Sequence, residues 1–156
     1  MRPDDMLARR VAREVEAEIT ALQTLTDELR SAGDTTDSIA LRARGSILHD
    51  FYTGTERMFI RIAEELNGGV PRGEQWHRQL LRDMSLEIPG VRPALISPEL
   101  EQRLADYLRF RHLFRNVYGF VLEADRMRSL ELDFESVLAE TVSQIRRFLS
   151  WMTGGA

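Results

Sequence analysis

The segment that decides the fold spans residues 4–31 and reads DDMLARRVAREVEAEITALQTLTDELRS. Its apolar residues recur every three or four positions, with acids and arginines between them: Leu7, Val11, Val15, Ile19, Leu22, Leu25 and Leu29. This spacing places the apolar side chains on one face of a helix. Gly33 follows, and glycine accepts the left-handed geometry that ends many helices. The segment therefore predicts an amphipathic helix over about residues 4–31.

Four further helices are expected along the rest of the chain. Their predicted ranges run from the caps at 34–37 to Asn67, from Pro71 to about Met84, from Ser97-Pro98 to about Gly119, and from about Ser129 or Asp133 to Met152. No strand-like alternation of useful length is present. The sequence therefore predicts an all-α, up-and-down bundle of four long helices and a short one. Residues 1–152 are expected to form a single domain, and residues 153–156 a frayed tail.

Two details of the expected elements concern packing. Gly45 and Gly54 lie inside the second helix, where each costs about 1 kcal/mol relative to alanine. Close approach of a neighbouring helix explains both glycines. Residues 85–97 contain prolines and predict a loop, but an apolar one, with Ile88, Val91, Leu95 and Ile96. We expect this loop to pack against the body of the bundle.

The composition of the chain excludes several kinds of chemistry. There is no cysteine, which rules out disulfides, thiolate metal sites and cysteine nucleophiles. All 21 basic residues are arginine, so lysine Schiff bases and phosphate-loop lysines are excluded. The N-terminus does not read as a secretory signal, and no run approaches the ~18 apolar residues of a membrane span. We expect a cytoplasmic protein that does not contact a membrane.

Positive charge is concentrated in one segment of an otherwise acidic chain. The net charge of −4 argues against a polyanion-binding surface, but residues 103–128 hold six arginines and only three acids. At helical spacing Arg111, Arg115 and Tyr118 share one stripe, and His112 and Asn116 share the adjoining one. Guanidinium groups bind phosphate through paired hydrogen bonds. The segment predicts a phosphate-binding groove; the alternative is a solvated arginine face.

The histidines are the remaining candidates for metal chemistry. None of the three, His49, His77 and His112, pairs with another at the i, i+4 spacing of two ligands on one helix face. Glu74 and His77 form a Glu-x-x-His motif, but a di-iron bundle needs two such motifs and two further glutamates. A metalloprotein that uses His49, His77 and acids is therefore the least favoured hypothesis. No metal and no other cofactor is expected.

The segment 107–120, YLRFRHLFRNVYGF, resembles the signature of the HEPN superfamily, most closely its HepT-like branch. That signature has an arginine, a polar residue, a spacer, a histidine and, two positions later, a tyrosine. Arg111, His112 and Tyr118 match the arginine, the polar residue and the tyrosine. Asn116 stands where the family has its histidine. The segment 73–81, GEQWHRQLL, is similar to one subgroup of the same branch.

The resemblance implies a toxin: a homodimeric, metal-independent endoribonuclease that cleaves RNA such as tRNA. Arg111, His112 and Asn116 are then expected to form the catalytic site, and Arg109 and Arg115 to bind RNA. The implied partner is a minimal nucleotidyltransferase antitoxin that adds AMP to Tyr118. The added phosphate would fill the cleft with negative charge and exclude RNA.

Asn116 leaves two alternatives open, because an asparagine side chain cannot transfer a proton at neutral pH. In the first, His112 supplies the imidazole from one turn earlier in the helix, and the chain is a ribonuclease. In the second, the chain is a non-catalytic HEPN-like module that binds RNA, a nucleotide or its nucleotidyltransferase partner.

Overall fold

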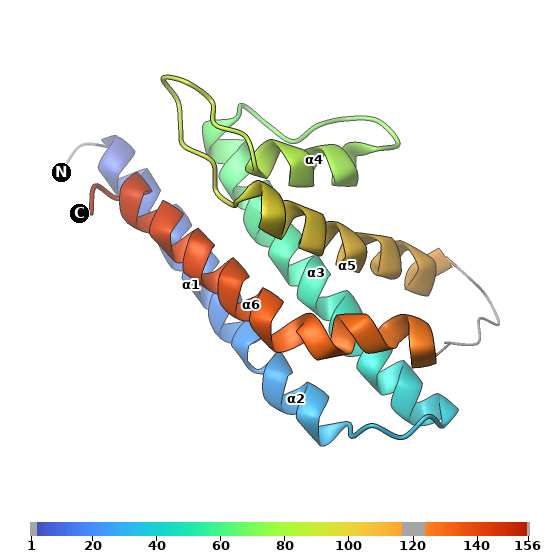
Figure 1. Ribbon diagram of the computed structural model, residues 1–156. Coiled ribbons are helices and arrows are strands. Elements are labelled where there is room, and N and C mark those ends of the chain that lie inside the picture. Colours follow the sequence, from blue (N-terminus) through green and yellow to red (C-terminus); the bar gives the residue numbers. More distant parts are fainter. Residues whose placement is uncertain (1–2, 117–123, 156) are drawn as a thin grey trace.

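The computed structural model describes residues 3–116 and 124–155 of the chain. These residues form helices and no strand: α1 (Pro3–Gln23), α2 (Leu25–Ser31), α3 (Ser38–Leu66), α4 (Trp76–Met84), α5 (Pro98–Asn116) and α6 (Ala124–Met152). The predicted all-α bundle is therefore confirmed. The central helix is α3, which contacts each of the other five, while α1 and α6 lie side by side along one flank (Figure 1). None of the helices described combines the length and the apolar character that crossing a bilayer requires.

The core is built around the buried face of α3. Phe51, Phe59 and Ile62 are fully buried on this helix. The ring of Phe51 meets Tyr107 of α5 and Phe134 of α6 edge-on, with centroid distances of 5.2 and 5.3 Å. These edge-to-face contacts add to the apolar area that the rings bury. They fix the position of α5 relative to α3.

The segment expected to form one helix over residues 4–31 forms two. The break falls at Thr24, whose amide donates to the carbonyl of Ala21 at 3.3 Å, three residues earlier. The Thr24 hydroxyl bonds the same carbonyl at 2.8 Å. Side-chain bonds of this kind compete with the regular helical ladder. The helical path resumes at Leu25, so the apolar stripe continues across the break and Leu22 and Leu25 are both buried.

Two other predicted helix starts were wrong by several residues. The short helix begins at Trp76 and not at Pro71, because Gly73 has a φ of +111°, which a right-handed helix does not accommodate. The last helix begins at Ala124 and not at Ser129 or Asp133. Met127 is buried one turn from this start, which extends the apolar stripe towards the N-terminus of α6.

Several of the predicted end signals act as expected. The Asp37 carboxylate accepts a hydrogen bond from the Ala40 amide at 3.0 Å and caps α3. This bond lowers the pKa of Asp37. The Ser97 hydroxyl accepts from the Leu100 amide at 3.1 Å and caps α5.

The glycine prediction is confirmed at Gly54. A Cβ atom there would lie 2.6 Å from Cδ2 of Leu22 and 2.8 Å from Oε1 of Glu18, so α1 approaches α3 at this glycine. Gly45 is also buried in α3.

The loop of residues 85–97 packs against the bundle at its C-terminal part only. Leu95 and Ile96 are buried, whereas Val91 is exposed. Arg92 is itself buried and makes four hydrogen bonds of 2.8–3.0 Å, to the Asn67 side chain and to the carbonyls of Leu86, Pro93 and Asp83. Through these bonds Arg92 joins the ends of α3 and α4 to the loop. It thereby holds the C-terminal end of α4 next to the C-terminal end of α3.

Candidate functional site

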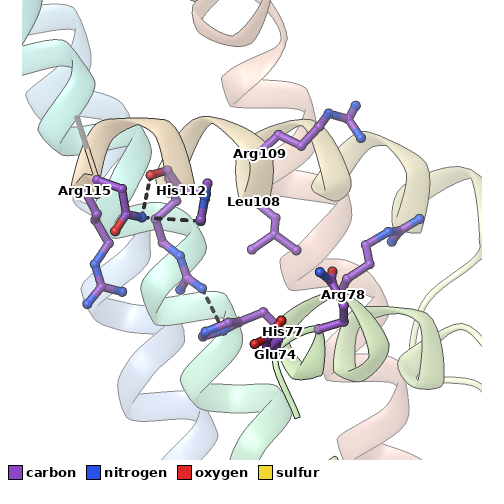
Figure 2. Close-up of a pocket in the computed structure, with 10 residues that line it drawn as sticks. Glu74, His77, Arg78, Leu108, Arg109, His112 and Arg115 are labelled. Atoms are coloured by element: carbon purple, nitrogen blue, oxygen red, sulfur yellow. Dashed lines mark hydrogen bonds between the residues drawn. The ribbon is translucent and has the colours of Figure 1, made fainter. Parts of the chain in front are cut away.

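A cavity of about 790 Å³ lies between α4 with its preceding turn and the C-terminal half of α5 (Figure 2). Its lining includes five of the six site residues expected from the sequence: Arg109, Arg111, His112, Arg115 and Asn116. The structure therefore brings these five together. Tyr118, the sixth predicted site residue, falls within residues 117–123 and lies outside the described residues.

Arg111 is the most buried of the charged residues that line the cavity. Only 3% of it is exposed. Its two terminal nitrogens each donate to one carboxylate oxygen of Glu56 on α3, both at 3.1 Å. The guanidinium carbon also lies 4.9 Å from the ring centroid of Tyr52, a cation–π contact. The positive charge of Arg111 is thus balanced by a buried carboxylate, and Arg111 is also one of the residues that line the cavity.

The ring of Tyr52 packs against the Arg111 side of this ion pair. Burial raises the pKa of its phenol well above the ordinary value, and the Glu56 carboxylate raises it further. The Tyr52 hydroxyl therefore stays protonated at physiological pH. The side chain is almost fully buried, and its ring packs against the Arg111 guanidinium.

His77 joins the same buried pair from α4. Its Nδ1 atom lies 2.9 Å from Oε2 of Glu56 and 3.0 Å from Nη2 of Arg111. The imidazole stacks on the indole of Trp76, with 3.7 Å between ring centroids and a 30° angle between planes. His77 also lines the cavity. From the sequence, His77 is a weak candidate for a metal ligand and is favoured as an ordinary surface or interface residue, because nothing in the spacing links it to Glu56 on α3.

His112 and Asn116 form a pair on the exposed side of the cavity. The Asn116 amide nitrogen donates to the His112 carbonyl at 2.8 Å and lies 3.3 Å from Nδ1 of the His112 ring. A carbonyl oxygen only accepts hydrogen bonds, so the amide nitrogen must face the ring as a donor. Nδ1 of His112 is then the acceptor, and the proton of the neutral ring sits on Nε2.

The four arginines of the cavity differ in their ion pairing. Arg78 bonds Glu101 at 2.7 Å, Arg109 pairs with Asp106, and Arg111 pairs with Glu56. Arg115 is exposed, and within residues 3–116 and 124–155 it makes no ion pair. Within the described residues, Arg115 is therefore the arginine of the cavity that is free to bind an anion.

The structure does not assemble the metal site weighed from the sequence. His49 bonds Asp50 at 3.1 Å and packs on the ring of Phe114, while His77 bonds Glu56. Across the residues described, no three histidine or acidic side chains gather in an arrangement that could hold a metal ion.

The chain was compared with models of known protein families. A family model described as HepT-like protein matches residues 43–152, well over half of the chain. The chain belongs to the HepT-like family. All residues that line the cavity fall inside the matched range, so the cavity belongs to the HepT-like part of the chain. No curated protein and no solved structure matches this HepT-like chain.

Proposed function

We propose that this HepT-like protein is a metal-independent endoribonuclease that binds and cleaves RNA in the cavity between α4 and α5. The observation that carries the proposal is that Arg115, which makes no ion pair with the residues that the structure describes, lines one cavity of about 790 Å³ together with His112. That volume lies within the range of small-molecule sites. Attack of a ribose 2′-hydroxyl on phosphorus requires positioning, proton transfer and charge stabilisation, all of which side chains can supply.

Each residue of the predicted site has a role in this proposal. Arg115 binds a phosphate of the RNA, and Arg109 adds positive charge at the rim. Arg111 presents its remaining N–H groups to the scissile phosphate while Glu56 balances its charge. His112 transfers a proton through Nε2, and Asn116 holds the His112 ring in the required tautomer.

The proposed partners follow from family membership. A second copy of the chain would pair with the first across the region of the cavity. A minimal nucleotidyltransferase would act as antitoxin by adding AMP to Tyr118, two positions beyond Asn116. The phosphate of that AMP would compete with RNA for Arg115.

A second candidate function is supported by the Asn116–His112 contact. The amide occupies Nδ1 of His112, and position 116 itself supplies no titratable group. A module that binds RNA or a nucleotide without cleaving it would need only the arginines and these hydrogen-bonding groups. Binding without cleavage is the result that distinguishes this function from the first.

The Arg115→Ala variant is expected to weaken RNA binding and to make binding less dependent on salt. Loss of one phosphate contact lowers the slope of log K against log [salt] by about 0.7 for single-stranded RNA. The measurement is fluorescence anisotropy of a labelled RNA at several salt concentrations. Arg57→Ala is the matched control, because Arg57 is similarly exposed but lies outside the cavity lining. Equal slopes for the two variants would contradict the assignment.

The proposed activity is tested by incubating purified protein with RNA in the presence of EDTA. We expect cleavage by the wild type and by Arg57→Glu, and strongly reduced cleavage by Arg115→Glu. Binding without cleavage would support the non-catalytic module. Neither binding nor cleavage by folded wild-type protein would overturn both functions.

A further inference from the structure

The proposed reaction needs two proton transfers, and His112 accounts for one of them. A proton must leave the attacking 2′-hydroxyl, and another must reach the departing 5′-oxygen. Asn116 donates to Nδ1 of His112, so Nε2 of the neutral ring carries a proton and acts as a donor. The family position that would hold another imidazole is Asn116 itself. The site therefore lacks a base among the residues of α5.

His77 is held in the cavity by contacts that fix its orientation. Its Nδ1 lies 2.9 Å from Oε2 of Glu56, and Glu56 is buried, with 5% of its surface exposed. The ring is stacked on Trp76, so rotation about its side-chain bonds would break both contacts. About a third of the His77 side chain is exposed, which leaves the ring accessible from the cavity that it lines.

We propose that His77 is the general base of this site and that Glu56 positions it. The proposal rests on the proposed ribonuclease function and names the residue that replaces the imidazole absent from position 116. Glu56 accepts the Nδ1–H of His77, which leaves the lone pair on Nε2 for a substrate proton. The arrangement is the carboxylate–imidazole pair by which a buried acid sets the tautomer of a catalytic histidine.

The step balances with these two histidines. Nε2 of His77 takes the proton of the 2′-hydroxyl as the O2′–P bond forms. The bond from phosphorus to the 5′-oxygen breaks, and that oxygen receives the Nε2 proton of His112. Nδ1 of the same ring takes up a proton from water and gives up its 3.3 Å contact with the Asn116 amide, which keeps its bond to the His112 carbonyl. The products are a 2′,3′-cyclic phosphate and a free 5′-hydroxyl. His77 then returns its proton to water, and His112 exchanges protons with water to recover the tautomer that carries its proton on Nε2.

The charges around His77 suit this role. Glu56 and Arg111 form a neutral pair before the reaction, because their two 3.1 Å bonds match one carboxylate with one guanidinium. When His77 takes up a proton, its Nδ1–H points at the Glu56 carboxylate, which stabilises the imidazolium. Arg111, 3.0 Å from the same Nδ1, has no acceptor atom, so the Nδ1–H can be accepted only by Glu56.

His49 provides a matched control within the same chain. It too has its Nδ1 on a carboxylate, that of Asp50 at 3.1 Å, and it too is partly buried. His49 does not line the cavity. A difference between the two histidines therefore reports on the cavity and not on acid-paired histidines in general.

The test is RNA cleavage in EDTA by wild type, His77→Ala and His49→Ala, with folding checked by circular dichroism and thermal unfolding. We expect His77→Ala to slow cleavage by roughly 10²–10⁴-fold, the usual contribution of general base catalysis, and His49→Ala to leave it unchanged. Free imidazole is expected to restore part of the activity of folded His77→Ala. A merely structural histidine would not be rescued in this way.

The contribution of Glu56 is tested in the same assay with Glu56→Gln. If Glu56 acts through His77, this change lowers cleavage more in the wild type than in the His77→Ala background, where only its effect through Arg111 remains. Equal losses in both backgrounds would overturn the positioning role.

The outcomes also separate the two proposals. Wild-type cleavage that survives His77→Ala, or loss without imidazole rescue, would overturn the assignment of His77 alone. Absence of cleavage by folded wild-type protein would overturn the ribonuclease function and this assignment with it.

Discussion

Replacing Arg111 with alanine is expected to lower the free energy of unfolding by about 3–5 kcal/mol. The change leaves the Glu56 carboxylate, whose side chain is 7% exposed, without the guanidinium that balances its charge. It also removes the cation that packs on Tyr52. Urea unfolding followed by circular dichroism measures the loss. The variant therefore tests stability. Its rate of RNA cleavage can be compared with that of the wild type only at temperatures where the variant is folded.

Two controls define this prediction. Arg109→Ala removes an exposed arginine from the same helix and is expected to change stability by less than about 1 kcal/mol, since surface pairs contribute little. The double variant Glu56→Leu with Arg111→Met removes both charges and is expected to cost much less than Arg111→Ala. A loss for Arg111→Ala no greater than that for Arg109→Ala would contradict the buried ion pair.

Replacing Arg92 with methionine is expected to lower the free energy of unfolding by about 3 kcal/mol. Methionine keeps the apolar stem but cannot donate the four hydrogen bonds that Arg92 makes. Hydrogen bonds from a charged donor contribute about 1.5–3 kcal/mol each. The total loss is smaller than the sum of the four bonds, because water that enters the loop can donate hydrogen bonds to the freed carbonyl groups. The acceptors include the Asp83 carbonyl near the end of α4, so the variant should also loosen α4 and with it His77.

Limited proteolysis measures this second effect together with urea unfolding. We expect faster cleavage of Arg92→Met within residues 85–97 than of the wild type. Arg82→Met is the control, because Arg82 is an exposed arginine on α4 whose side chain makes no hydrogen bond within residues 3–116 and 124–155. Wild-type stability and an unchanged digestion pattern for Arg92→Met would show that the loop does not depend on this side chain.

The fold follows largely from local sequence, and its deviations have local causes. Apolar spacing and end signals such as Ser97-Pro98 place the helices because burial of one face stabilises each of them. The break at Thr24 depends on one side-chain bond, which periodicity does not reveal. The anchoring of the loop depends on Arg92, and the sequence does not distinguish it from any solvated arginine.

The site is predictable only where it lies on one helix. Helical spacing brings Arg111, His112, Arg115 and Asn116 together, and the structure places them around one cavity. Glu56 is 55 residues from Arg111 and 21 from His77, so their contacts arise from the packing of α3 against α4 and α5. No spacing rule reaches across helices, and the pairing of Arg111 with a buried carboxylate could not be foreseen.

The central claim is that this HepT-like protein cleaves RNA by 2′-hydroxyl attack without a metal. The most direct measurement is analysis of the RNA ends that the purified protein leaves in the presence of EDTA. The account predicts 2′,3′-cyclic phosphates and free 5′-hydroxyls, since the 2′-oxygen attacks and the 5′-oxygen departs. Ends that carry a 5′-phosphate, cleavage that EDTA abolishes, or intact RNA after incubation with folded protein would contradict it.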